Sequence, residues 1–169
     1  MLAGLSRRLH GLIVDVESYS LQSGTQRVEY ANARGETLCA IVDRWGEPRG
    51  ATCVVIPPAW GKTKETLLPL AETILATFRE AGEPVTVLRY DGIRRRGESH
   101  NDPECRIPGY ENLHYTFSQG AEDVQTTLDF LESSPGLRPR TVILVTFSVA
   151  SIEARRAIAG EQRGRIGGW

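Results

Sequence analysis

The chain has 169 residues, of which 40% are hydrophobic and 24% are charged, and its formal net charge is −1. This length suits one domain with a hydrophobic core, and the near-neutral charge lacks the basic field of a nucleic-acid-binding protein. The three cysteines show no C-x-x-C spacing, and no apolar run is long enough to span a membrane. We therefore expect a cytoplasmic protein with no membrane span, no nucleic-acid partner, no metal and no cofactor.

The first predicted elements are strands. Residues 1–24 give only a weak pattern, which we interpret as a leader, a linker or an extra strand. Arg27–Ala33 and Thr37–Trp45 are rich in β-forming residues and are separated by a short turn, which is typical of a hairpin. Thr52–Ile56 is a continuous apolar and β-branched run, which predicts a strand buried on both faces.

A helix, a strand and a long loop follow. Lys64–Ala81 has apolar residues at helical spacing, and Gly82 stands where a C-terminal cap belongs. Val85–Tyr90 is the next predicted strand, and a polar loop runs from there to about Tyr110. Ser118 is then predicted to cap a helix that ends at Glu132.

The last elements complete a repeating pattern of strands and helices. Thr141–Phe147 is the clearest strand in the sequence, Ser151–Ala159 has the pattern of a helix, and Arg165–Trp169 that of a further strand at its entry. This alternation implies βαβ crossovers, and hence an α/β fold with a mixed, mostly parallel sheet in a three-layer αβα arrangement. We predict that the five longer strands lie in the order first, second, fourth, third, fifth.

Ser148 is the sharpest candidate for chemistry. It lies between a predicted buried strand and a helix with almost no connecting loop, where an α/β-hydrolase places its nucleophile on a strained turn. The turn needs small residues two positions on either side, usually glycine, and here they are Thr146 and Ala150. The alternative is that Ser148 only caps the helix. The nucleophile hypothesis predicts a positive φ angle at Ser148.

The loop after Ile56 is the second candidate. In an α/β-hydrolase this loop gives one backbone N–H to the oxyanion hole, and the residue after the nucleophile gives the other. By position these donors are Trp60 and Val149. The run from Gly61 to Thr63 also resembles the end of a nucleotide-binding P-loop, although Ile56 stands where that motif needs a glycine.

Two further polar groups are interpreted as structural. Asp91, after the fourth predicted strand, is expected to accept hydrogen bonds from backbone N–H groups of its own loop. Arg94, Arg95 and Arg96 form the only dense basic run, and we expect them to lie in a solvated loop.

The segments Val54–Gly92 and Ile143–Ala157 resemble the acyltransferases (thioesterases) of the bacterial bioluminescence fatty-acid reductase system, which are α/β-hydrolases. The resemblance covers roughly residues 27–169 and depends on Trp60, on the Arg-Tyr-Asp strand end and on an elbow without the usual glycines. It implies that residues 25–169 are the N-terminal part of an α/β-hydrolase domain, truncated after the elbow helix. It also implies a fatty acyl ester or thioester as substrate and acyl carrier protein as a donor.

A base for Ser148 is missing from the expected position. In this fold the catalytic acid and histidine follow the serine, but no histidine does so here; His100 and His114 precede it and are expected to be surface residues. Glu153, directly behind the elbow, is poorly placed to orient a base. We expect these 169 residues alone to be inactive and to self-associate through an exposed edge of Thr141–Phe147. The alternative function is a non-catalytic binding or interaction module.

Overall fold

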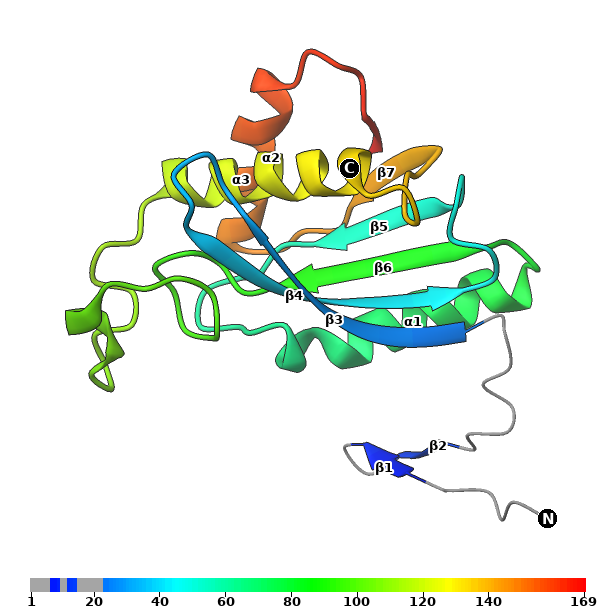
Figure 1. Ribbon diagram of the computed structural model, residues 1–169, viewed down its shortest axis with the longest axis horizontal. Coiled ribbons are helices and arrows are strands. Elements are labelled where there is room, and N and C mark those ends of the chain that lie inside the picture. Colours follow the sequence, from blue (N-terminus) through cyan, green and yellow to red (C-terminus); the bar gives the residue numbers. More distant parts are fainter. Residues whose placement is uncertain (1–6, 10–11, 15–22) are drawn as a thin grey trace.

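A mixed six-stranded sheet forms the centre of the protein in the computed structural model, which describes residues 7–9, 12–14 and 23–169 (Figure 1). The strand order is β3-β4-β6-β5-β7-β8, so the predicted order of the first five strands is confirmed. Strands β3, β4 and β6 pair antiparallel, whereas β6, β5, β7 and β8 are parallel. The strands are β3 (Ser23–Ala31), β4 (Thr37–Trp45), β5 (Thr52–Ile56), β6 (Val85–Tyr90), β7 (Thr141–Leu144) and β8 (Ile166–Gly168).

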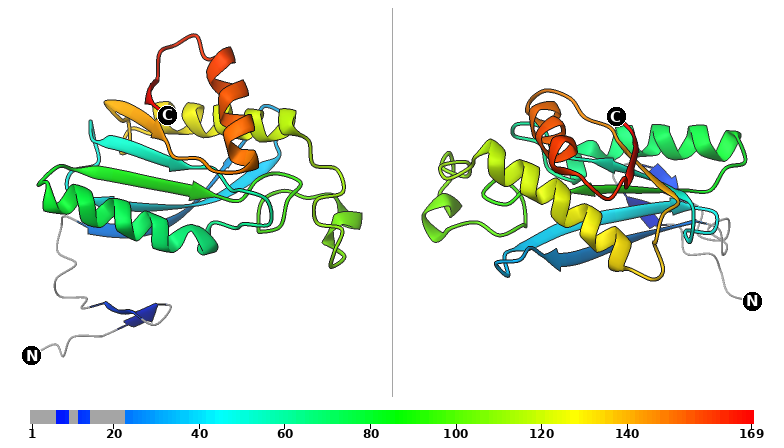
Figure 2. Two further views of the ribbon diagram at one scale, coloured as in Figure 1. Left: turned by 180° about the vertical axis from the view of Figure 1, so that it is seen from behind. Right: turned by 90° about the horizontal axis from the view of Figure 1, so that it is seen from above.

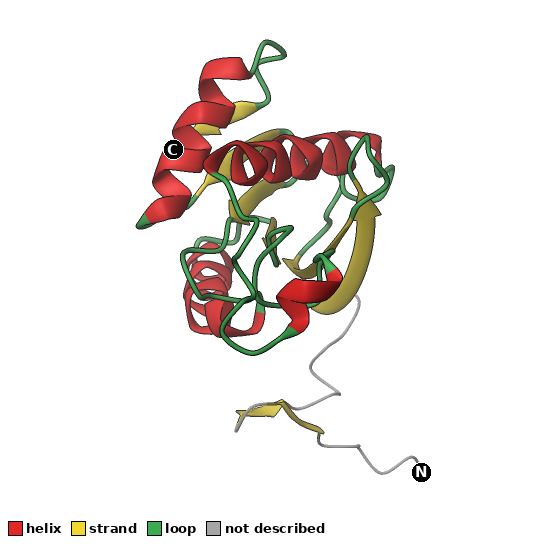
Figure 3. Cartoon of the chain, turned by 90° about the vertical axis from the view of Figure 1, so that its left-hand side faces the viewer, coloured by secondary structure: helices red, strands yellow, loops and turns green. Residues whose placement is uncertain are grey.

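Helices cover both faces of this sheet, which gives the predicted three layers (Figures 2 and 3). Helix α1 lies on one face, and α2 and α3 lie on the other. The helical elements are η1 (Glu65–Leu67), α1 (Leu68–Glu80), η2 (Pro103–Arg106), α2 (Phe117–Ser133) and α3 (Val149–Gly160).

The two central strands are buried on both faces, as their continuous apolar runs predict. In β5, Cys53 and Val55 pack in the core under α2 and α3, while Val54 and Ile56 pack in the core against α1. Every residue of β5 and β6 is buried. Because side chains alternate across a strand, one short run can supply both cores only if nearly every position is apolar.

Several element boundaries differ from the prediction: α1 begins at Leu68 rather than Lys64, and α3 begins at Val149 rather than Ser151. Helix α2 is capped by Thr116, whose Oγ1 accepts a hydrogen bond from the N–H of Gln119 at 3.1 Å, so the predicted cap at Ser118 is wrong. Strand β7 ends at Leu144 rather than at Phe147, and the chain turns toward α3 after Val145, whose N–H still donates to β5. Strand β3 begins at Ser23, which lengthens the hairpin with β4.

The edge of the sheet also differs from the prediction. Strand β8 pairs parallel with β7, so β7 is enclosed between two neighbours and its predicted exposed edge is wrong. A Cβ added to Gly167 would lie 2.0 Å from the Thr141 Oγ1. Glycine therefore allows β8 to approach β7 closely.

The N-terminal leader or linker predicted for residues 1–24 lies mostly outside the described residues. Its described parts are β1 (Arg7–Leu9) and β2 (Leu12–Val14), which pair antiparallel in a two-stranded sheet of their own. In the part of the chain that the structure describes, no helix has the length and apolar character needed to cross a membrane.

Candidate active site

Ser148 lies on a strained turn at the carboxyl end of β7. Its φ and ψ angles are 55° and −134°, a conformation that favours glycine, and the prediction of a positive φ angle is confirmed. Helix α3 begins at the next residue, Val149, and the Ser148 side chain makes no capping hydrogen bond to the helix. Ser148 is exposed to solvent.

The residues around the turn are compatible with close strand-to-helix packing. Ala150 is fully buried, as expected of a small residue on the inner side of the elbow. The Thr146 hydroxyl lies 3.2 Å from the Ser151 hydroxyl and accepts a hydrogen bond from the Trp169 Nε1 at 2.9 Å. Thr146 thus occupies the usual glycine position with its side-chain oxygen satisfied on both sides.

The loop after β5 reaches the same edge of the sheet as Ser148. Strands β5 and β7 are parallel neighbours, and the N–H of Val145 donates to the carbonyl of Val55 at 2.9 Å. The chain beyond each strand therefore emerges at one carboxyl edge, which is where ligands bind in open α/β sheets. Trp60 lies in the β5 loop, is 54% exposed, and is followed by Gly61 with a φ of 67°. The assignment of the Trp60 and Val149 N–H groups to an oxyanion hole stays a prediction.

The same loop does not form a phosphate-binding nest. Three successive N–H groups that a P-loop would direct at a phosphate are bound to protein acceptors. The Lys62 N–H donates to the Ala59 carbonyl at 3.0 Å, the Thr63 N–H to the Thr66 Oγ1 at 3.0 Å, and the Lys64 N–H to the Asp91 Oδ1 at 2.7 Å.

Asp91 has the structural role predicted for it. Its carboxylate is fully buried and accepts from the N–H groups of Lys64 and Glu98, at 2.7 and 2.8 Å, and the Lys64 Nζ lies 2.7 Å away. A Cβ on Gly97 would lie 2.3 Å from the Asp91 Cγ, so glycine leaves room for this carboxylate. Asp91 thereby joins the loops that follow β5 and β6.

Arg95 connects the elements around the candidate site, so the prediction of a solvated arginine run is wrong for this residue. It is buried, forms an ion pair with Glu153 of α3, and donates to the carbonyl of Pro58 at 2.6 Å. Its guanidinium also lies 4.0 Å from the ring centroid of Tyr115, whose hydroxyl donates to Glu153. Burial raises the pKa of Glu153, while Arg95 lowers it.

The neighbouring arginines differ from each other. Arg94 is partly buried and pairs with Glu36 and Asp102, whereas Arg96 is exposed as predicted. Sequence reasoning missed the two paired arginines because Glu36 and Glu153, which bind Arg94 and Arg95, each lie 58 positions away in the chain. The only local signal was Gly92, where a Cβ would lie 2.7 Å from the Arg95 Cδ.

The histidines of the described residues are not bonded to Ser148. The His100 Nε2 lies 3.9 Å from a Glu36 oxygen, and the His114 Nε2 lies 3.0 Å from a Glu104 oxygen. Both side chains are partly exposed, in keeping with the prediction of surface histidines. The third histidine, His10, lies outside the described residues. Within residues 23–169, Ser148 therefore has no histidine base in contact with it.

Comparison with known proteins identifies the fold. No protein-family model and no curated protein matches the chain. Among solved structures, an esterase from Pyrococcus furiosus has a TM-score of 0.64 and 15% identity over 86% of this chain and 51% of its own. The α/β hydrolase GrgF from Penicillium sp. sh18 has a TM-score of 0.62 and 19% identity, over 85% and 43%. DcsB in complex with its substrate analogue has a TM-score of 0.61 and 22% identity, also over 85% and 43%.

The sequence identities are low, so these similarities support the fold alone. The chain spans about half the length of these structures or less. The strand order, the helices on both faces and the turn at Ser148 agree with the same architecture. The chain has an α/β-hydrolase-like fold.

Proposed function

We propose that this chain carries the nucleophile of a serine hydrolase or acyltransferase that acts on acyl esters or thioesters. The observation that supports this proposal best is the backbone of Ser148, a non-glycine residue with a φ of 55° directly before a helix. A serine that only caps a helix adopts an ordinary β-region backbone and bonds its hydroxyl to the helix N–H groups. Ser148 does neither, whereas a nucleophile elbow requires both departures.

The proposed reaction begins with attack of the Ser148 Oγ on the acyl carbonyl carbon. The carbonyl oxygen becomes negatively charged, and the N–H groups of Trp60 and Val149 would stabilise it. The bond to the leaving oxygen or sulfur then breaks, and the departing alcohol or thiol takes up the proton that Ser148 lost. The acyl group is left as an ester on Ser148. Water or another acceptor attacks this ester and releases the acyl group.

The reaction also needs a base to accept the Ser148 proton. No histidine contacts Ser148 in the described residues, and Glu153, the nearest carboxylate on α3, is bound to Arg95 and Tyr115. The proposal therefore requires a histidine and an acid beyond the described residues, in the chain order typical of this fold. Without them the hydroxyl stays protonated, and we expect negligible turnover at pH 7.

The surroundings of the site support an apolar acyl group. Trp60 and Phe117 both contact the ring of Tyr115 edge-on, at centroid distances of 5.6 and 5.9 Å, and both are exposed. Phe147, next to Ser148, is also exposed. Exposed aromatic groups that gather at one edge are typical of a ligand or partner surface. We propose a fatty acyl chain as the ligand and a carrier protein thioester as the donor that the family resemblance implies.

Covalent labelling tests the nucleophile. A fluorophosphonate probe is incubated with the chain at neutral and alkaline pH, and the modified residue is mapped by mass spectrometry. At alkaline pH solvent hydroxide replaces the missing base, so we expect slow labelling of Ser148. The label should persist in Ser151→Ala, a serine in the first turn of α3, and should vanish in Ser148→Ala. Labelling that spreads over several serines, or that survives Ser148→Ala, would contradict the proposal and favour a binding module.

A further inference from the structure

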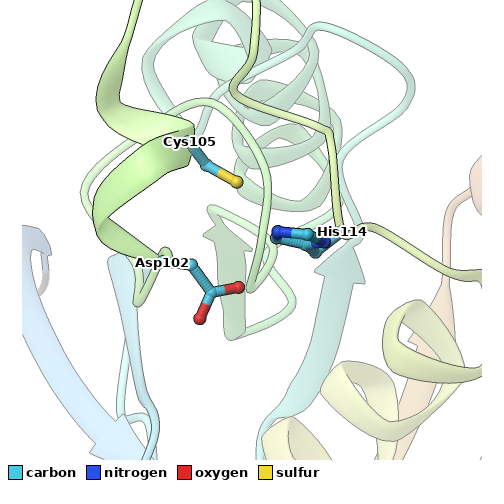
Figure 4. Close-up of side chains that lie close together, drawn as sticks. All are labelled: Asp102, Cys105 and His114. Carbon is cyan, nitrogen blue, oxygen red and sulfur yellow. The ribbon is translucent and has the colours of Figure 1, made fainter.

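Three side chains with metal-binding atoms converge in the loop between β6 and α2. One ligand atom each of Asp102, Cys105 and His114 lies within 4.8 Å of the other two. Figure 4 shows the three side chains directed toward a common space. Asp102 precedes η2, Cys105 lies within it, and His114 follows in the same loop.

The donor set combines three different chemistries. Cys105 is a free cysteine, fully buried, and can supply a thiolate. His114 is partly exposed and can supply an imidazole nitrogen from the solvent side. A thiolate, an imidazole and a carboxylate together suit Zn²⁺, which binds sulfur, nitrogen and oxygen donors in four-coordinate sites.

Two neighbouring residues complete the arrangement. The Arg94 Nε lies 3.1 Å from the Asp102 Oδ2, which leaves the other carboxylate oxygen for a metal and fixes the orientation of the group. A Glu104 oxygen lies 3.0 Å from the His114 Nε2 and can orient the imidazole as an outer-shell partner. The pairing of Glu104 with His114 alone would not account for the buried Cys105 beside them.

The cluster lies in a long loop that a bound metal ion would stabilise. The connection 91–116 is long and holds only the short η2 as regular structure, whereas most connections in compact domains are a few residues long. A metal that joins His114 to η2 would close this loop and reduce its entropy. It would also hold the adjacent Tyr115, which packs against Trp60 and Arg95 at the candidate active site.

We propose that Asp102, Cys105 and His114 bind a divalent zinc-class metal ion in a structural site. In a tetrahedral zinc site the ligand atoms are about 3.3–3.8 Å apart, so a small contraction of the observed cluster suffices. On binding, the Cys105 thiol releases its proton to solvent and the sulfur bonds to the metal. The site takes part in no step of the acyl chemistry and does not depend on Ser148.

Metal titration of the full chain tests this proposal. The chain is stripped with a chelator, dialysed and titrated with Zn²⁺ against a competing indicator dye. We expect one Zn²⁺ per chain, and at least roughly 100-fold weaker binding in Cys105→Ser and His114→Gln, since loss of an outer-shell partner alone weakens metal sites by about 10–100-fold. His100→Gln, a partly exposed histidine beside Glu36, is the matched control and should bind as the unmodified chain does.

A spectroscopic measurement identifies the sulfur ligand. With Co²⁺ in place of Zn²⁺, the unmodified chain should show a thiolate-to-cobalt charge-transfer band that Cys105→Ser lacks. Circular dichroism shows whether each variant folds. If Cys105→Ser does not fold, the test depends on His114→Gln, whose side chain is exposed. Absence of stoichiometric binding, or equal affinity in a folded His114→Gln, would overturn the metal site. Neither result bears on the labelling of Ser148.

Discussion

The backbone of Ser148 stores strain that a purely structural serine would not need. A side chain at a φ of 55° and a ψ of −134° costs on the order of 1–3 kcal/mol, and such strain persists where the surrounding structure enforces it. Among the described residues, the other non-glycine residue with a positive φ is Arg94, at 56°. Because of this strain, we expect one substitution of Ser148 to raise the free energy of unfolding, whereas most substitutions lower it.

Ser148→Gly is predicted to stabilise the protein. Glycine relieves the strain, and we expect the free energy of unfolding to rise by roughly 0.5–2 kcal/mol in spite of the greater freedom of the unfolded chain. Ser151→Gly, in the first turn of α3, should lower it by about 0.5 kcal/mol, because glycine is a weaker helix former than serine. Urea unfolding of both variants measures the difference. A loss of stability in Ser148→Gly would show that the turn is not strained.

The buried Arg95 provides the second prediction at this scale. Arg95→Met leaves Glu153 as a buried charge without its partner, and we expect a loss of about 3–5 kcal/mol in the free energy of unfolding. Arg96→Met, at an exposed neighbouring position, should change it by no more than about 0.5 kcal/mol. Thermal or urea unfolding distinguishes the two. Similar small effects from both would mean that Arg95 is solvated after all.

At the scale of elements, the contact between α2 and α3 depends on a glycine. A Cβ on Gly120 of α2 would lie 2.4 Å from the Glu153 Cδ of α3. Glu153 is enclosed by Arg95 and Tyr115 and cannot easily move away. Helix propensity and packing therefore act in opposite directions at this position.

Gly120→Ala is predicted to destabilise the protein by roughly 1–3 kcal/mol, because overpacking outweighs the better helix propensity of alanine. Gly160→Ala is the matched control, since Gly160 ends α3 and a Cβ there would meet no atom within 4 Å. That variant should be neutral or gain up to about 1 kcal/mol. Melting temperatures in parallel measure both. Stabilisation by Gly120→Ala would contradict the close packing of the two helices.

Helix α2 also contributes a pH-sensitive contact. Asp123 accepts hydrogen bonds from the N–H of Ile93 at 2.9 Å and from the Gln119 side chain at 2.9 Å. Burial raises the pKa of Asp123 to about 7, and the nearby Glu153 contributes in the same direction. The carboxyl group therefore binds its proton more tightly in the folded protein than in the unfolded chain.

The sign of the resulting pH dependence is determined by this raised pKa. Between about pH 4 and pH 7 the folded protein holds a proton that the unfolded chain has lost, so the free energy of unfolding should fall as the pH rises. The fall could reach about 4 kcal/mol at roughly 1.4 kcal/mol per pKa unit. Asp123→Asn should flatten the slope, as urea unfolding at stepped pH would show. An unchanged slope would contradict the raised pKa.

Glu36→Gln is the control for Asp123→Asn, because the pKa of Glu36 is lowered in the folded protein whereas that of Asp123 is raised. Burial opposes the charge on Glu36, but hydrogen bonds from Asn32, Arg94 and Arg34 outweigh it and lower the pKa to about 2. The stabilisation from Glu36 is thus present above about pH 4.5 and is lost as the pH falls toward 2. In Glu36→Gln, the free energy of unfolding should fall less between about pH 4.5 and pH 2. Its slope between pH 4 and pH 7 should stay as in the unmodified chain.

At the scale of the whole molecule, the sequence predicts the strands of the sheet better than it predicts the side-chain contacts in the loops at the carboxyl edge of the sheet. The strands β5 and β6 were predicted at their observed bounds because burial on both faces requires continuous apolar runs. The turn at Ser148 was predictable because it lies directly between a strand and a helix. Both features are local, so a short stretch of sequence contains the information.

The features that were missed depend on residues far apart. Arg95 pairs with Glu153, 58 positions away, and three successive arginines give no sign of which one is buried. Asp102, Cys105 and His114 come together through the course of a long loop rather than through C-x-x-C spacing. Such contacts form only when the whole fold brings distant segments together.

A structure of the chain with an alkyl boronic acid tests the central claim, that Ser148 is a nucleophile facing an oxyanion hole. A boronic acid accepts the serine oxygen and becomes tetrahedral, like the intermediate of acyl transfer. The account predicts boron bonded to the Ser148 Oγ, with one boronate oxygen about 2.7–3.1 Å from the N–H groups of Trp60 and Val149. A boronate bonded to another serine, or bonded to Ser148 with its oxygens turned away from both N–H groups, would contradict it.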